Sequence, residues 1–452
     1  MSTVSTKPRK KILLVTYVFP PYAAVGVYRI LKFCKFLPEF GYDPVILTPK
    51  DPNVLGLDDG LMDQVDEKIP VYRTPSWEPF RAKREQPASS SVPSSSSEAG
   101  GSKRPNPLAP LKQLIKANLS VPDTSLLWGL SGFNMGRAAI NDEGVDIVLS
   151  SSPPQSVHLL GHRLARSTGR PLIADFRDLW TQNTSYRERN LPGYLHRRNR
   201  SFEQKVLRES SGLSVNTETF KQQLLGNNPF LDPDQVMVVN NGVDPDDFRE
   251  MLNSSSPNER FTILYTGSLY GDHRNPEFFF QALRQWLDRN PEIGEHINVK
   301  FIGNWTDKHH GIIERFKLGS VVEKLGWMPQ RKVLAETFAA DLLLLIQGFD
   351  PVLSAALPRK LYEYMITNKP VLAFAPAGEI PEVMQRYNCG VCLSSADPNP
   401  IIESLDAQFR TWQAAREVAG VDTVGLREMP DLETMGQVEK LAQFCDRIIQ
   451  EK

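Results

Sequence analysis

The chain alternates apolar segments of strand length with helical segments, and this alternation limits the folds that it can adopt. It begins with an apolar run at Lys11–Tyr17, a turn-rich loop at Phe19–Gly26, a helix expected over Val27–Phe40 and a second apolar run at Val45–Thr48. A strand, a helix and a second strand within about forty residues predict a βαβ unit with parallel strands.

The same pattern restarts near Arg260. Further strands are expected in the first half at 146–150, 172–174 and 212–216, and in the second half at 261–266, 298–302, 322–325, 341–346, 371–374 and 390–393. Because these runs are apolar almost throughout, they fit sheets that are covered on both faces. The sequence therefore predicts an α/β protein with two doubly wound, Rossmann-like halves that face each other across a cleft.

A length of 452 residues exceeds what one ordinary core supports, so two domains are expected. The pattern places an N-terminal domain over 11–240 and a C-terminal domain over 241–430. The last helix, within 431–452, has no strand after it and is expected to pack back on the first domain. Residues 86–107 are rich in Ser and Pro and are predicted to form a disordered insertion, because they offer too little apolar surface to repay ordering.

Composition narrows the class of protein. Hydrophobic residues make up 40% and charged residues 23% of the chain, as in soluble globular proteins, and a net charge of −1 gives no nucleic-acid signature. No apolar run approaches the roughly 20 residues that span a bilayer, and the four cysteines favour a reducing cytoplasm. His158 and His162 share a helical face but lack an acidic third ligand, so neither a metal site nor a cofactor is predicted.

The segment Pro358-Arg359-Lys360-Leu-Tyr-Glu363 carries the sharpest chemical signal. A turn is followed by a short helix that places Lys360 and Glu363 one helical turn apart. The first amides of such a helix carry partial positive charge and suit a phosphate, while Glu363 suits the vicinal hydroxyls of a sugar. Together these groups indicate a nucleotide; the alternative is an exposed helical ion pair.

Three post-strand loops hold the other candidate residues. Gly267-Ser268 and Arg274 follow a second-half strand, and Arg274 offers a planar donor fork to a diphosphate, unless it is an ordinary surface arginine. In the first half, the candidates are Gly26, which permits close approach of an anion or simply a tight turn, and the loop Asp175-Phe-Arg177-Asp178-Leu-Trp180. For that loop the alternative is an internal Asp–Arg ion pair.

Together these residues resemble the retaining family-four glycosyltransferases, which have the GT-B fold. The resemblance runs from about Lys11 to Leu393 without the Ser-rich insertion, and a bacterial polysaccharide or glycolipid branch is the most similar. The segments that carry it are Phe19-Pro-Pro, Gly26-Val-Tyr-Arg29, Ser152-Pro-Pro, Asp175–Trp180, Asn241-Gly-Val-Asp244 and Gly326-Trp-Met-Pro329.

The resemblance implies a nucleotide-sugar donor held mainly by the second half. Glu363 is then expected to bind the ribose, Arg274 and Lys360 the diphosphate, and the loop with Trp327 the base. The remaining expected substrate-binding residues are Gly26, Gly267, Ser268 and Arg359, and the remaining expected catalytic residues are Asp175, Arg177 and Asp178. The chain departs from the family at Ser268, which replaces a basic residue, and at Ala355, which replaces a glutamate that touches the transferred sugar.

The expected activity is metal-independent transfer of a sugar, with retention, from a nucleotide-diphosphate donor to a polysaccharide or lipid-linked acceptor. A nucleotide-sugar epimerase of the same fold is one alternative; it would turn over donor without an acceptor. A catalytically weak, nucleotide-binding partner subunit is another, and it would bind without turnover. No nucleic-acid partner is expected.

The segment Arg187–Arg208 carries seven basic and two acidic residues, interleaved with Leu191, Tyr194, Leu195 and Phe202. Such a stretch suits anionic headgroups, so we expect a cytoplasmic protein with peripheral contact at the inner membrane surface. The alternative is a solvated helix whose arginines pair locally.

Overall fold

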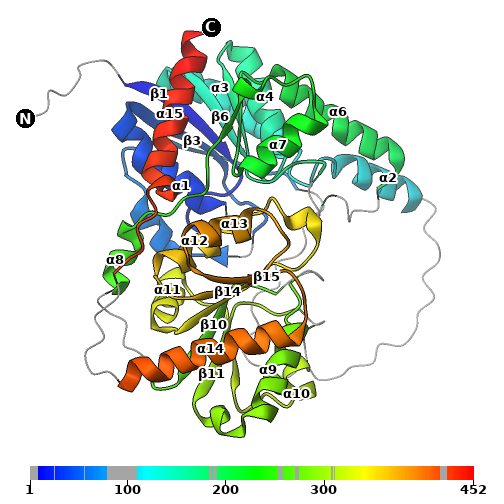
Figure 1. Cartoon of the computed structure of the whole chain (residues 1–452). Coiled ribbons are helices and arrows are strands. Elements are labelled where there is room, and N and C mark those ends of the chain that lie inside the picture. Colours follow the sequence, from blue (N-terminus) through cyan, green and yellow to red (C-terminus); the bar gives the residue numbers. More distant parts are fainter. Residues whose placement is uncertain are drawn as a thin grey trace, which may run out of the picture. The chain divides into compact units, whose positions relative to one another are not determined.

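The computed structural model describes residues 9–24, 26–54, 56–78, 109–182, 186, 191–252, 258–269, 274–306, 309, 311–417 and 425–451 (Figure 1). The predicted insertion at 86–107 lies outside these residues. The chain forms two compact units. Unit 1 comprises 1–215, 227–237 and 438–452, and unit 2 comprises 216–226 and 238–437.

Unit 1 is built on a seven-stranded sheet in the order β5-β3-β1-β6-β7-β8-β9. The pairs from β5 to β8 are all parallel. The strands are β1 (Lys10–Thr16), β3 (Tyr42–Pro49), β5 (Val71–Thr74), β6 (Ile147–Ser152), β7 (Leu172–Phe176), β8 (Gly212–Val215) and β9 (Val236–Val238). A small antiparallel pair joins β2 (Tyr22–Ala23) to β4 (Gly56–Leu57).

The helices of unit 1 cover the sheet by their apolar faces. They are α1 (Val27–Phe36), α2 (Ala109–Leu119), α3 (Trp128–Glu143), α4 (Ser156–Thr168) and α6 (Gly193–Glu209), with 3-10 turns η1 (Leu37–Phe40), η2 (Asp59–Gln64) and η3 (Pro233–Gln235). Gly136 brings α3 close to the sheet, because a Cβ there would lie 2.7 Å from a methyl group of Leu47.

The last helix, α15 (Thr434–Gln450), closes unit 1 with its C-terminal part. Asp446 accepts hydrogen bonds from Lys10 Nζ at 2.5 Å and from Tyr42 Oη at 2.6 Å. At the other edge of its contact, Phe444 and Ile448 pack over Gly212 so closely that a Cβ on the glycine would overlap them. The end of the chain is thereby fixed to β1, β3 and β8.

Unit 2 has a six-stranded parallel sheet in the order β12-β11-β10-β13-β14-β15. The strands are β10 (Phe261–Thr266), β11 (Ile297–Ile302), β12 (Val322–Gly326), β13 (Leu342–Ile346), β14 (Val371–Phe374) and β15 (Gly390–Leu393). Its helices are α7 (Glu218–Asn227), α8 (Asp246–Leu252), α9 (Glu277–Arg289), α10 (Ile312–Arg315), α11 (Gln330–Ala339), α12 (Arg359–Ile366), α13 (Glu379–Arg386) and α14 (Pro398–Glu417), with 3-10 turns η4 (Pro291–Glu295), η6 (Pro351–Leu353) and η7 (Pro430–Leu432).

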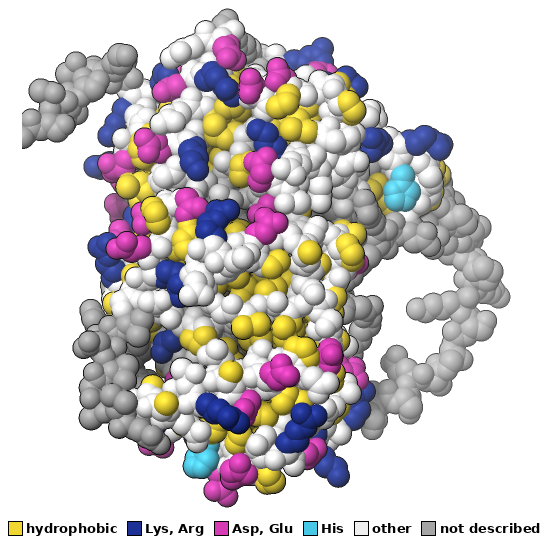
Figure 2. Space-filling model, viewed as in Figure 1, with side chains coloured by type: hydrophobic (Ala, Val, Ile, Leu, Met, Phe, Trp, Pro, Cys, Tyr) yellow, Lys and Arg dark blue, Asp and Glu magenta, His cyan; other side chains and the backbone are white. Residues whose placement is uncertain are grey.

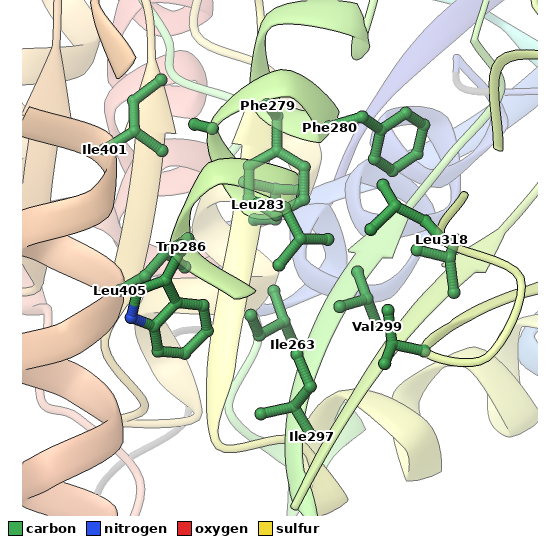
Figure 3. Close-up of a cluster of buried hydrophobic side chains, with 14 of the residues drawn as sticks. Ile263, Phe279, Phe280, Leu283, Trp286, Ile297, Val299, Leu318, Ile401 and Leu405 are labelled. Carbon is green, nitrogen blue, oxygen red and sulfur yellow. The ribbon is translucent and has the colours of Figure 1, made fainter. Parts of the chain in front are cut away.

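One face of this sheet is covered by α9 and α14. Figure 3 shows Trp286 of α9 and Leu405 of α14 beside each other, with Ile263 of β10 and Val299 of β11 beneath α9. These side chains are almost fully buried. Helix α12 covers the opposite face through Leu361, whose cluster includes Leu343 and Leu345 of β13.

The predicted fold class is confirmed, since both units are Rossmann-like with parallel sheets. The helix expected over Val27–Phe40 is α-helical only to Phe36. It then tightens to a 3-10 turn at Leu37-Pro38 and ends at Gly41, whose φ of 85° few residues other than glycine adopt.

Each sheet has one point at which the winding direction reverses. In unit 1 this point lies between β1 and β6, and in unit 2 it lies between β10 and β13. Ligands of open α/β sheets bind outside the carboxyl ends of the strands at such a point. We therefore expect ligand-binding residues in the loops that follow these four strands.

Candidate functional site

Lys360 lies at the carboxyl end of β10 in unit 2. Its Nζ donates to the Thr266 carbonyl at 2.9 Å and to Tyr265 Oη at 3.1 Å, and it lies 4.2 Å from the centroid of the Tyr265 ring. Gly267 has a φ of 111°, and a Cβ there would lie 3.1 Å from Nζ. The glycine therefore gives the ammonium group close access to the end of the strand.

Helix α12, which carries Lys360, is anchored to the same strand. Tyr364 Oη accepts from the Thr266 amide at 2.8 Å and lies 2.9 Å from Thr266 Oγ1. The helix begins after Pro358, whose side chain makes no capping hydrogen bond, and the Leu361 amide donates to the Pro358 carbonyl at 2.9 Å.

Arg274 adds a second positive charge to this place. Its Nη2 lies 3.5 Å from Gln347 Oε1, which follows β13, so the two loops at the switch point of unit 2 meet here. Burial lowers the pKa of Lys360 well below its usual value, and the charge of Arg274 lowers it further, against the opposite influence of Glu363. An anion with several oxygens would relieve this concentration of positive charge.

Glu363 lies on α12 one turn after Lys360. Its Oε1 accepts a hydrogen bond from Gln330 Nε2 at 2.9 Å and forms an ion pair with Arg359, whose Nη2 lies 3.0 Å away. The sequence left open that Glu363 belongs to an exposed ion pair along the helix, but its surroundings are largely buried. The side chains of Arg359 and Glu363 are only 21% and 14% exposed.

The strand ends beside Lys360 are packed through glycines. Gly303, at the end of β11, has a φ of 130° and lies so close to Gly267 that a Cβ would be 2.4 Å from the Gly267 carbonyl oxygen. Its amide donates to the Gly326 carbonyl at 2.7 Å. This packing fixes the start of the Ser268 loop against the end of β12, where Trp327 follows with 56% exposure.

In unit 1, Asp175 is wholly buried at the end of β7. It accepts from Arg29 Nε at 3.0 Å and Nη2 at 2.8 Å, and from the hydroxyls of Ser151 and Ser214 at 2.7 Å each. Burial alone would raise the pKa of Asp175, but the charge and hydrogen bonds of Arg29, with those of the serines, outweigh it and lower the pKa. This geometry favours the alternative of an internal ion pair, with Arg29 of α1 as the partner.

Arg177 and Gly26 are brought together at the switch point of unit 1. Arg177 donates from Nε to the Ser152 carbonyl at 2.7 Å and from Nη2 to the Pro153 carbonyl at 3.1 Å. A Cβ on Gly26 would lie 2.0 Å from Arg177 Nη1, so only glycine leaves room for the guanidinium. Burial lowers the pKa of Arg177, and the charges of Asp178 and Asp175 oppose this shift.

The candidates thus form one cluster in each unit. Unit 2 gathers Lys360, Gly267, Arg274, Glu363 and Arg359 around the end of β10, and unit 1 gathers Gly26, Arg177, Asp178 and Asp175 around the ends of β6 and β7. The roles assigned to these residues and to Ser268 and Trp327 stay predictions.

Sequence reasoning gave no role to Gln330, Tyr265, Ser151 or Ser214, and it noted Arg29 only as part of a motif. Gln330 directly follows the loop Gly326–Pro329, Ser214 lies in a predicted strand, and Ser151 directly follows one. No local signal distinguishes such residues, because their partners are distant in the sequence.

No group of three or more His, Cys, Asp or Glu side chains is arranged to hold a metal ion in the described part of the chain. Across the same residues, no helix is both long and apolar enough to span a bilayer.

Residues 100–247, about a third of the chain, match the family model described as Glycosyltransferase Family 4. A search of curated protein sequences gives no match to the chain.

Solved structures similar to the chain have the GT-B fold. HepE of Anabaena, in complex with UDP and glucose, is 15% identical with a TM-score of 0.54, covering 98% of both chains. Sucrose-phosphate synthase of Thermosynechococcus elongatus is 15% identical with a TM-score of 0.54, covering 98% of this chain and 97% of the other. A putative UDP-N-acetylglucosamine 2-epimerase of Listeria monocytogenes is 11% identical with a TM-score of 0.56, covering 98% of both chains.

Proposed function

We propose that this protein is a glycosyltransferase that moves a sugar, with retention, from a nucleotide-diphosphate donor to a polysaccharide or lipid-linked acceptor. The observation that carries the proposal is the positive cluster of Lys360 and Arg274 at the switch point of unit 2, with Glu363 one helical turn away. The match of residues 100–247 to the glycosyltransferase family model and the GT-B fold support it.

The chemistry required of unit 2 is electrostatic. When the bond between the sugar and the diphosphate breaks, positive charge develops on the sugar and negative charge grows on the phosphate oxygens. Lys360 Nζ, the Arg274 guanidinium and the first amides of α12 are donors held in place before the reaction, and such donors stabilise a leaving group without reorganisation. Glu363 would accept hydrogen bonds from the ribose hydroxyls and fix the nucleoside.

Unit 1 is assigned to the acceptor. Arg177 is held by two backbone carbonyls, and Asp178 lies in the same loop, so this loop presents both charges at the carboxyl edge of the sheet. Asp175, being buried and paired with Arg29, would act by holding the loop rather than by touching the substrate.

The decisive experiment measures nucleotide binding and turnover in Glu363→Ala and Arg274→Ala. Each variant should lose most of the thermal stabilisation by UDP or another nucleoside diphosphate, because ligand binding raises apparent stability by mass action. Glu403→Ala in α14 and Arg289→Ala in α9 are matched controls, since both side chains are exposed and lie outside the cluster. Wild-type binding and turnover in both site variants would contradict the proposal.

The similarity to an epimerase structure makes one further measurement useful. An epimerase acts on a nucleotide sugar without an acceptor, whereas a transferase needs one. Conversion of UDP-N-acetylglucosamine to its epimer in the absence of acceptor would contradict the transferase proposal and favour an epimerase.

Tight nucleotide binding with no turnover of any donor and acceptor pair would favour the alternative of a catalytically weak partner subunit. The residues Ala355 and Ser268, at which the chain departs from the family, support this alternative.

We also propose that unit 1 contacts an anionic membrane surface. Arg197, Arg200, Lys205 and Arg208 of α6 are exposed, and basic side chains are visible over α6 in Figure 2. Residues 187–190 lie outside the described part of the chain. Leu195, which was expected among the apolar residues of this surface, is wholly buried.

The apolar part of the contact is assigned mainly to α2 instead. Leu114 and Ile115 are 50% and 48% exposed, and Tyr194 of α6 is 40% exposed. Asn118 of α2 donates to Tyr194 Oη at 3.0 Å, so the two helices are adjacent. Flotation with anionic and with neutral liposomes at low and raised salt tests this. Binding should require anionic lipid and weaken with salt and in Leu114→Ser/Ile115→Ser; equal binding to neutral vesicles would contradict it.

A further inference from the structure

Gln330 is placed between two segments that have separate roles in the proposed nucleotide site. It is the first residue of α11 and directly follows the loop Gly326–Pro329, which is expected to hold the base. Its side-chain Nε2 donates to Glu363 Oε1 at 2.9 Å, although the two residues are 33 positions apart. This hydrogen bond connects the base loop to the carboxylate that is expected to bind the ribose.

The carboxylate of Glu363 has two partners at one oxygen, the hydrogen-bond donor Gln330 and the ion-pair partner Arg359. Arg359 Nη2 reaches the same Oε1 at 3.0 Å from the preceding turn of α12. A hydrogen bond from one helix and an ion pair from another oppose rotation of the carboxylate more strongly than either would alone. Among the described residues, no group donates a hydrogen bond to Oε2, so this second oxygen keeps its capacity to accept from a ligand.

We propose that Gln330 is a positioning residue that fixes Glu363 Oε2 for a ribose hydroxyl and thereby sets the preference of the site for ribonucleotides over deoxyribonucleotides. The inference rests on the proposed function, because it takes unit 2 to be the nucleotide-binding unit. An acceptor with a fixed position forms a favourable hydrogen bond only with a hydroxyl at one place on the ligand. A ligand that lacks this hydroxyl leaves the acceptor without a donor and binds more weakly.

The test compares matched nucleotides in matched variants. The dissociation constants of UDP, 2′-deoxy-UDP and 3′-deoxy-UDP are measured by calorimetry for the wild type, Gln330→Ala and Gln330→Glu. If a different nucleoside diphosphate stabilises the wild type best, it and its two deoxy forms take the place of the uridine series. Lys332→Ala is the control, since this exposed residue lies on the same turn of α11.

The wild type should bind the ribonucleotide about tenfold or more tightly than at least one deoxy form, since one hydrogen bond to a charged group is at stake. Gln330→Ala should weaken ribonucleotide binding severalfold and leave binding of that deoxy form nearly unchanged, so that the ratio falls. Gln330→Glu should weaken it more, because a second carboxylate faces Glu363. Lys332→Ala should change neither affinity.

Two results would overturn the inference while leaving the proposed function intact. One is a wild type that binds all three nucleotides equally, and the other is a Gln330→Ala variant in which all three affinities fall by the same factor, as a general loss of structure would cause. Melting temperatures of the variants without ligand separate misfolding from this second result. A wild type that binds no nucleoside diphosphate would overturn both the inference and the proposed function.

Discussion

The pair of Arg29 and Asp175 allows a quantitative prediction about unit 1. The side chains are 3% and 0% exposed and are joined through both carboxylate oxygens. The substitution Arg29→Met keeps much of the side-chain volume and removes the charge. Asp175 would then remain buried, with the hydroxyls of Ser151 and Ser214 as its hydrogen-bond donors.

The expected cost follows from the burial of the remaining charge. Removing one partner of a buried ion pair costs about 3–5 kcal/mol, which is a large part of the roughly 5–15 kcal/mol that stabilises a domain. For a unit of this size the loss corresponds to a fall in melting temperature of about 6–20 °C. The double variant Arg29→Met/Asp175→Leu should recover most of it, because no charge is left behind, although two buried hydroxyls lose their acceptor.

The dependence on pH gives a second check. In the wild type the pKa of Asp175 is lowered, so its contribution is fully present above the unfolded value of about 3.9 and is lost as pH falls through the folded value. In Arg29→Met, burial without the arginine should raise the pKa of Asp175 instead. Acid would then protonate the buried carboxylate and remove the free-energy cost of its charge. The difference in stability between wild type and variant should therefore shrink from pH 7 toward pH 4.

The assay is urea unfolding or calorimetry of wild type, both single variants and the double variant at several pH values. A cost below about 1 kcal/mol for Arg29→Met would mean that the pair is not desolvated as its burial indicates. A gap that stays constant across pH would show that the loss is one of packing rather than charge.

Three further outcomes are expected. Lys360→Met should stabilise the ligand-free protein at pH 7 and abolish nucleoside diphosphate binding. Because burial lowers the pKa of Lys360, the stability of the wild type should rise relative to that of the variant as pH increases from this lowered pKa toward about 10.4. Melting curves with and without UDP would show both effects. Gly26→Ala should displace the Arg177 guanidinium and reduce transfer while nucleotide affinity stays near that of the wild type, as turnover and calorimetry on one preparation would establish. Asp178→Asn should do the same through loss of charge, and an affinity that falls in proportion to turnover would place this loop in the nucleotide site instead.

The strands were predictable because their signal is local. Runs such as those of β1, β10 and β13 are apolar throughout, and a parallel sheet covered on both faces needs such runs. The position of Arg274 in a loop after a strand was predictable for the same reason. The end of a strand is marked in the sequence by the change from apolar residues to Gly and polar residues.

The partners of the buried charges were not predictable in the same way. Asp175 was predicted to be catalytic, with an internal Asp–Arg ion pair as the alternative, and the arginine that reaches it is Arg29, 146 positions away in the sequence. Glu363 was predicted to bind ribose, with a helical pair with Lys360 as the alternative; its partners in the structure are Arg359 and Gln330 of another helix. Which donor reaches a carboxylate depends on how helices pack on the sheet, and the spacing of residues does not contain that information.

The contrast between the two units bears on where an anionic ligand would bind. In unit 1 the buried Asp175 has a full set of donors, so its charge is balanced within the protein. In unit 2 the partners of Lys360 are a carbonyl, a hydroxyl and a ring. Glu363, a nearby acidic group, pairs with Arg359 and accepts a hydrogen bond from Gln330. A buried charge that lacks a counterion costs free energy, and positions that keep such a charge tend to be functional. The negative charge that would balance Lys360 is therefore expected from a ligand, and a diphosphate would supply it at the point where the winding of the sheet reverses.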